Sequence, residues 1–84
     1  NEEFVEAMHK VRLSRLRTGA TDWELVHSVT DRDQFREIYD VPTWREYLRQ
    51  EQTRTTGEDR RIIQAAWDLA ETEPRVRWFL PASA

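Results

Sequence analysis

Two histidines, His9 and His27, are the side chains of this sequence that ordinarily titrate near neutral pH. They fall in different predicted elements and form no His-x-x-x-His or other ligand spacing, and the chain has no cysteine to complete a metal site or a disulfide. His9 is expected on the surface. His27 follows Trp23 and Leu25 in a strand pattern, so we expect a half-buried histidine satisfied by a neighbour, with a general base as the alternative.

Other catalytic chemistry has equally little support in the sequence. Ser14 and Ser28 are not set in a nucleophile-elbow pattern. Asp31 and Asp33 are typical of a turn, and with only two glycines there is no phosphate-binding loop. The sequence therefore predicts no cofactor, no metal and no confident catalytic residue.

The aromatic residues are the best candidates for a ligand site, since four Trp, three Phe and two Tyr are many for 84 residues. An apolar cleft with a few polar groups suits a flat hydrophobic ligand. The candidate cleft residues are Trp23, His27, Tyr39, Trp44, Arg45, Tyr47, Arg49 and Trp67, with Trp78 as a further aromatic candidate. The simpler interpretation is that these aromatics form the core and the dimer interface of a small domain.

Composition narrows the class of protein. A formal net charge of −3 argues against nucleic acid as the main partner. No apolar run approaches the roughly 20 residues that span a bilayer, which predicts a soluble segment, and the lack of cysteine fits a cytoplasmic location. A core this small supplies only about 3–5 kcal/mol, so we expect oligomerisation to add stability.

The predicted elements begin with a helix over Asn1–Thr18, in which Phe4, Met8, Val11 and Arg15 share one face. Gly19 suits the left-handed position after the helix. The basic residues towards the helix end favour the helix dipole; attraction to an anionic membrane or ligand is the alternative interpretation.

Two alternating segments, Ala20–Val29 and Gln34–Val41, predict an antiparallel hairpin that Pro42 ends. Thr43 with Glu46 predicts a capping box that opens a helix to about Thr53, and Thr55 with Glu58 predicts a second box. A helix over Glu58–Glu71 and a short strand over Val76–Leu80 complete the expected order. The residues expected in the buried stripe of that helix are Ile62, Ile63, Ala66, Leu69 and Ala70, with Trp67 alongside.

This order predicts an α+β fold, a ferredoxin-like split βαβ with an antiparallel sheet whose first strand is missing from the chain shown. We expect residues 1–84 to be a single domain, the C-terminal part of a longer protein. Helices would cover one face of the sheet and leave either Val26 and Ile38 or the row of Trp23 and Leu25 on the other. Packing that face on a second copy predicts a dimeric α+β barrel.

The run Arg15–Ala20, then Trp23, then Pro42–Gln50 resembles the soluble C-terminal tails of major facilitator exporters of the transmembrane secretion effector type. Those tails are similar to antibiotic biosynthesis monooxygenase-like domains, which are ferredoxin-like and pair into barrels. The likeness extends from Phe4 to Leu80. The related tails often have histidine where this chain has Tyr47 and Glu51, so any proton chemistry of those histidines is lost here.

The resemblance implies a cytoplasmic C-terminal dimerisation or ligand-sensing domain of an efflux transporter, at the cytoplasmic face of the membrane and not itself catalytic. The alternative is a stand-alone cofactor-independent monooxygenase acting on an aromatic or polycyclic substrate. The expected partners are a second copy, bound through the sheet, and a small hydrophobic aromatic ligand. Nucleic acid is not expected, and contact with the membrane would come only through a tethered transporter portion.

Overall fold

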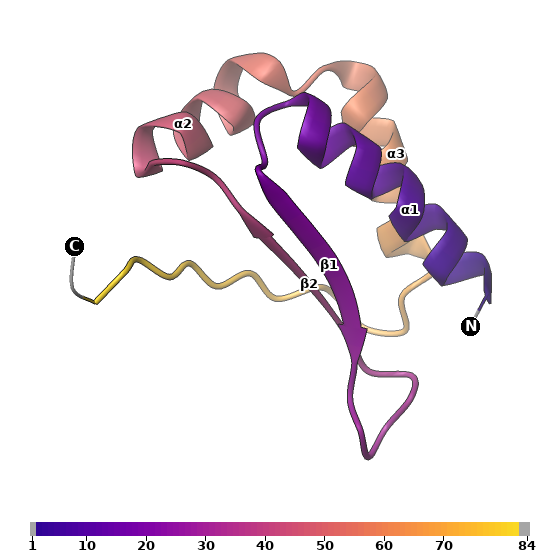
Figure 1. The fold of residues 1–84 in the computed structure, drawn as a ribbon. Helices are drawn as coiled ribbons and strands as arrows, with labels where there is room; N and C mark the ends of the chain where they lie inside the picture. Colours follow the sequence, from indigo (N-terminus) through magenta and orange to yellow (C-terminus); the bar gives the residue numbers. More distant parts are fainter. Residues whose placement is uncertain (1, 83–84) are drawn as a thin grey trace.

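A two-stranded antiparallel sheet is covered on one face by two helices in the computed structural model, which describes residues 2–82 (Figure 1). Helix α1 (Glu2–Arg17) is followed by strands β1 (Asp22–His27) and β2 (Phe35–Asp40). Helix α2 (Trp44–Arg49) continues into the π-helical turn η1 (Gln50–Arg54), and α3 (Gly57–Asp68) lies beside α1. The predicted α+β class is confirmed.

Helix α1 follows its predicted pattern closely. Met8, Val11, Ser14 and Arg15 are buried, acidic residues occupy the first turn and basic residues the last. Gly19 ends the helix with a φ of +132°, a conformation that side chains with a Cβ rarely adopt. The expectation of a positive φ at Gly19 is therefore confirmed, and the turn directs the chain into β1.

The hairpin has the predicted antiparallel pairing, with strands shorter than expected. Trp23 lies opposite Tyr39 and Leu25 opposite Glu37, and these four side chains face the helices. The other face carries Asp22, Glu24, Val26, Arg36, Ile38 and Asp40, all exposed. We call this the open face. The structure thus decides between the two predicted arrangements, since Val26 and Ile38 are on the face that the helices leave uncovered.

The two caps after the hairpin differ in how well they were predicted. Thr43 caps α2 by accepting from the Glu46 backbone N–H at 3.1 Å, which confirms one half of the predicted box. The Glu46 carboxylate pairs with Arg49 and Arg54 instead of returning to Thr43. The second box is not Thr55 with Glu58. Thr56 and Asp59 form it reciprocally, and the helix begins at Gly57. Thr55 instead donates its hydroxyl to the Gln50 carbonyl, and Glu58 pairs with Arg61.

The core lies between α1, α3 and the inner face of the sheet. Met8, Val11 and Ala66 are its buried members, and partly buried side chains surround them: Phe4, Ala7, Trp23, Leu25, Ile62, Ile63 and Trp67. Leu69, expected in the buried stripe of α3, is exposed because the helix ends at Asp68. A core this small buries little apolar surface, so the hydrophobic contribution to the stability of the domain is small.

The predicted last strand over Val76–Leu80 is wrong. This segment runs away from the hairpin as an extended chain without strand pairing (Figure 1). Trp78 contacts α2 instead of a sheet edge, and an isolated segment without an edge partner cannot form a ladder. Over residues 2–82, no helix combines the length and the apolar character needed to cross a bilayer.

Candidate functional site

Four side chains from three elements meet beneath α1 and form what we call the buried polar cluster: Arg15, Trp23, Glu37 and Tyr39. Arg15 donates to both carboxylate oxygens of Glu37, through Nε at 3.1 Å and Nη2 at 3.4 Å. Trp23 Nε1 donates to the same carboxylate at 2.8 Å. The Arg15 guanidinium also lies 4.7 Å from the centre of the Tyr39 ring, in cation–π range.

Burial strengthens the ion pair in this cluster, because the side chains of Arg15 and Glu37 are only 9% and 14% exposed and water screens their charges little. Desolvation by itself would lower the pKa of Arg15, but the charge and hydrogen bond of Glu37 raise that pKa above its ordinary value. Burial raises the pKa of Tyr39 to about 12, against a smaller opposing effect of the Arg15 charge. Tyr39 therefore stays neutral at physiological pH and is a poor proton acceptor.

Gln50 links the cluster to the π-helical turn η1. Its side chain is fully buried and donates through Nε2 to the Arg15 carbonyl at 3.3 Å and to Thr18 Oγ1 at 3.0 Å. Thr18 in turn donates to the Ser14 carbonyl at 2.7 Å. Gln50 thus adds a second donor to the Arg15 carbonyl, which also accepts from the Ala20 backbone N–H at 2.9 Å, and it holds η1 against the end of α1.

A second buried carboxylate joins α1 to α3. Asp59 pairs with Arg17 and accepts from the Thr56 backbone N–H at 2.8 Å. Burial acts to raise the pKa of Asp59, but hydrogen bonds from Arg17, Thr56 and Ser14 outweigh it and hold that pKa well below its ordinary range. This carboxylate is charged and fully engaged, so its role is to connect the two helices.

Three aromatic rings, which we call the aromatic trio, join α2 to the C-terminal segment: Trp44, Tyr47 and Trp78. Trp44 and Tyr47 stack with centroids 5.1 Å apart, and Trp78 meets both edge-on at 6.5 and 6.4 Å. Trp44 and Trp78 are about half exposed. The trio binds the C-terminal segment to α2, and its open position does not enclose a ligand.

The predicted cleft residues are divided among several places. Trp23 and Tyr39 belong to the buried polar cluster, and Trp44 and Tyr47 to the aromatic trio. Trp67 packs against the core, and Arg49 pairs with Glu46 at 3.2 Å.

His27 and Arg45 are exposed. His27 meets the Phe35 ring edge-on and contacts the Ser28 carbonyl through Nδ1 at 3.0 Å. The expectation of a half-buried His27 is wrong, since the side chain is exposed at the last position of β1.

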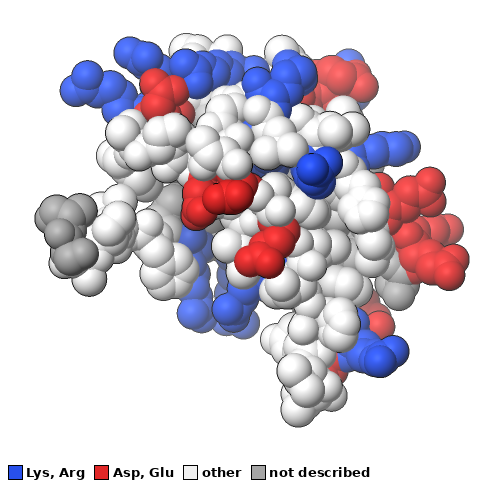
Figure 2. Space-filling model, viewed as in Figure 1, with Lys and Arg blue, Asp and Glu red and all other residues white. Residues whose placement is uncertain are grey.

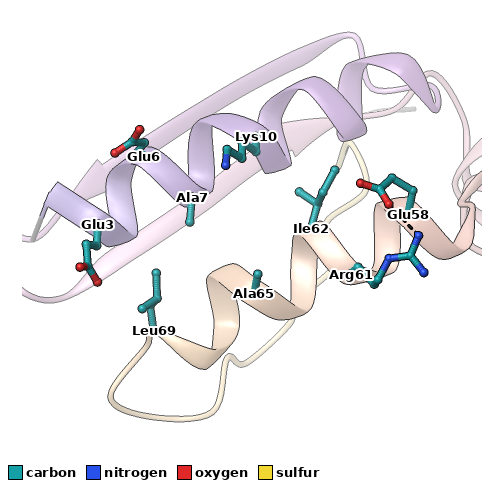
Figure 3. Close-up of a pocket in the computed structure, with 9 residues that line it drawn as sticks. All are labelled: Glu3, Glu6, Ala7, Lys10, Glu58, Arg61, Ile62, Ala65 and Leu69. Carbon is teal, nitrogen blue, oxygen red and sulfur yellow. Dashed lines mark hydrogen bonds and ion pairs between the residues drawn. The ribbon is translucent and has the colours of Figure 1, made fainter.

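A shallow groove of about 560 Å³ lies between α1 and α3. Figure 3 shows the small and aliphatic side chains between the helices and the charged ones along the rims. The lining residues are Glu3, Glu6, Ala7, Lys10, Glu58, Arg61, Ile62, Ala65 and Leu69. Within residues 2–82, no group of three His, Asp or Glu side chains is placed to hold a metal ion.

The most strongly positioned polar residues, Arg15, Glu37, Gln50 and Asp59, were not among the predicted site residues. A signal for the first two was present. Arg15 falls on the apolar face of the first helix pattern and Glu37 in the inward row of the second strand. Complementary charges at core positions of neighbouring elements indicate a buried ion pair.

Comparison with known proteins supports an assignment at the family level. The family model described as transmembrane secretion effector matches residues 1–84. No curated protein and no solved structure matches the chain. The match confirms the family part of the resemblance and relates the chain to the major facilitator superfamily and to transport. This chain therefore belongs to the transmembrane secretion effector family.

Proposed function

We propose that this chain is a non-catalytic domain at the cytoplasmic face of a major facilitator exporter, where it pairs two copies through the open face of its sheet. Family membership supports the exporter, and the open face carries the pairing. Val26 and Ile38 are 38% and 40% exposed there, on a sheet of only two strands. Such a sheet gains stability when its apolar side chains are covered.

The open face also has charges arranged along its length. Asp22 lies opposite Asp40 at one end, Glu24 opposite Ile38 in the middle, and Val26 opposite Arg36 at the other end. The first end is acidic and slightly hollow, since these carboxylates line a shallow pocket of about 310 Å³. Like charges directly opposite each other destabilise a hairpin, so the pair of Asp22 and Asp40 favours a basic partner.

Two copies that pack face to face about a twofold axis across the middle of the open face would cover the apolar side chains and bring opposite charges together. Each Arg36 would approach the acidic end of the other copy, with Val26 beside it, and Ile38 in the middle row would pack on its counterpart. An isologous contact requires such self-complementarity. The ferredoxin-like arrangement and the dimeric barrel belong to the same proposal, because the order α1-β1-β2-α3 is the middle of a split βαβ unit.

The non-catalytic part of the proposal is supported by the polar groups. The Glu37 carboxylate accepts three N–H groups, and the high pKa of Tyr39 keeps its proton in place. A general base needs a pKa near the working pH and access to substrate. Oxygen uptake above background with an aromatic quinol would contradict this part.

The pairing is tested by sedimentation of the wild-type chain and of Val26→Asp and Ile38→Asp. We expect a dimer for the wild type and a monomer for either variant, with unchanged circular dichroism because both side chains are exposed in the single chain. Arg36→Asp should weaken the dimer, and adding Asp40→Arg should restore part of the affinity. Val29→Asp is the matched control, since Val29 is exposed outside the sheet.

A stable wild-type monomer at high micromolar concentration would overturn the pairing. So would a dimer that persists in both aspartate variants, because the contact would then lie elsewhere on the molecule.

A further inference from the structure

The C-terminal segment and the helix that it contacts expose a set of apolar residues that the proposed dimer does not use. We call it the C-terminal patch: Trp44, Val76, Trp78, Phe79 and Leu80. We propose that this patch, with Arg75 and Arg77, is a contact site for an anionic membrane surface. The inference requires family membership only and is independent of pairing through the open face.

Exposure is the first observation. Phe79 is 82% and Leu80 is 71% exposed, and Val76 and Trp78 each show more than half of their surface. Figure 2 shows uncharged atoms that project at the left edge of the molecule, where Figure 1 places the end of this segment. Soluble proteins rarely leave so many large apolar side chains together without a binding partner, which indicates an interaction site.

Attachment is the second observation. Trp78 meets the rings of Trp44 and Tyr47 edge-on, so the middle of the segment is held against α2. Trp44 and Leu48, both in α2, are also exposed. The patch therefore has a fixed base, and the residues after Trp78 project from it.

Charge decides which partner fits. Between Pro74 and Pro81 the charged residues are Arg75 and Arg77, and the nearest acidic residue along the sequence is Glu73. Glu46 of α2 is paired with Arg49 and Arg54. Tryptophan and other large apolar side chains favour the bilayer interface, and arginine near it is attracted to anionic headgroups. A family of transmembrane proteins brings its members close to a lipid surface.

The test is vesicle sedimentation of the whole chain. One set of vesicles contains phosphatidylcholine alone and the other adds phosphatidylglycerol, at millimolar lipid and at low and high salt. We expect binding to the anionic vesicles, weakened by salt and small on phosphatidylcholine. Phe79→Ser with Leu80→Ser should weaken that binding at least about tenfold, because two large apolar side chains no longer enter the interface.

The contribution of charge is tested by two double variants that each remove two arginines, and a third double variant is the control for the serine pair. Arg75→Gln with Arg77→Gln should weaken binding about 25-fold, since each basic residue near an anionic surface contributes about fivefold. Arg12→Gln with Arg32→Gln changes the net charge equally on exposed arginines of α1 and the hairpin loop, and should have a much smaller effect. Leu13→Ser with Val29→Ser is the apolar control, because both residues are exposed elsewhere.

Three results would overturn the proposal. The first is a wild-type chain that does not sediment with anionic vesicles. The second is an equal loss in the control pairs, which would indicate nonspecific attraction. The third is a serine pair that leaves vesicle binding intact but abolishes self-association in the absence of lipid, which would identify a second copy as the partner of the patch.

Discussion

At the residue scale, Arg15 and Glu37 do most to define the interior. Each occupies a position that the surrounding pattern would give to an apolar side chain. Arg15 donates to Glu37, and Glu37 also accepts from Trp23 Nε1. An ion pair of this kind is costly to break from one side, because the remaining charge stays buried without a partner.

We expect Glu37→Ala to lower the free energy of unfolding by about 3 kcal/mol, since it leaves the Arg15 charge uncompensated. The double variant Arg15→Met with Glu37→Leu should recover most of that loss. Urea denaturation followed by tryptophan fluorescence measures both. Equal stability of Glu37→Ala and the wild type would mean that the ion pair is solvent-screened and contributes little.

At the scale of elements, the start of α3 shows how contacts with a neighbouring helix determine where a helix begins. Thr55 with Glu58 and Thr56 with Asp59 have the same spacing, so local sequence permits either box. Arg17 of α1 pairs with Asp59, and Ser14 adds a further hydrogen bond to it. The box that forms is therefore the one that α1 stabilises, and helix α3 begins at Gly57.

This arrangement predicts a pH dependence for the joint between α1 and α3. The pKa of Asp59 is lower in the folded chain than its ordinary value, so its contribution to stability is full above the ordinary pKa and is lost as the pH falls through the folded one. Asp59→Asn should destabilise the chain by about 2 kcal/mol at pH 7.

The measurement is urea denaturation of both proteins from pH 7 to pH 2. The gap between wild type and Asp59→Asn should narrow as the pH falls below about 4, because only the wild type loses this contribution. Asp33→Asn, at an exposed turn, should show no such gap. A gap that stays constant with pH would rule out the charge of Asp59 as its source.

At the scale of the whole molecule, the C-terminal segment stands apart from the packed part of the chain. Its large apolar side chains remain exposed, and the core between α1, α3 and the sheet does not include them. Burial, not sequence position, decides whether removing a terminal segment affects stability.

Truncation after Glu73 should therefore change the free energy of unfolding of the isolated chain by no more than about 1 kcal/mol, the size of a few partly exposed ring contacts. Thermal and urea denaturation test this. Trp44 should become more accessible to a quencher, because Trp78 is removed. A loss of several kcal/mol would mean that Val76–Leu80 forms a stabilising strand after all.

Much of the fold follows from the sequence alone. The 4-3-4 spacing of Phe4, Met8, Val11 and Arg15, the alternation of the hairpin and the position of Gly19 are local patterns, and local geometry is enough to interpret them. The same is true of the Thr43 cap. The family resemblance, carried by the same stretches, is likewise a property of the sequence.

Tertiary structure decided the rest, because those features depend on which surfaces meet. Only the position of the helices shows that Val26 and Ile38 are exposed on the open face, and only the contacts with α1 select Asp59 for the cap. Val76–Leu80 has the alternation of a strand, but a strand exists only with a partner edge, and Trp78 packs on α2 instead. The eight predicted cleft residues share an aromatic and polar composition, yet packing separates them, since composition does not determine which side chains come together.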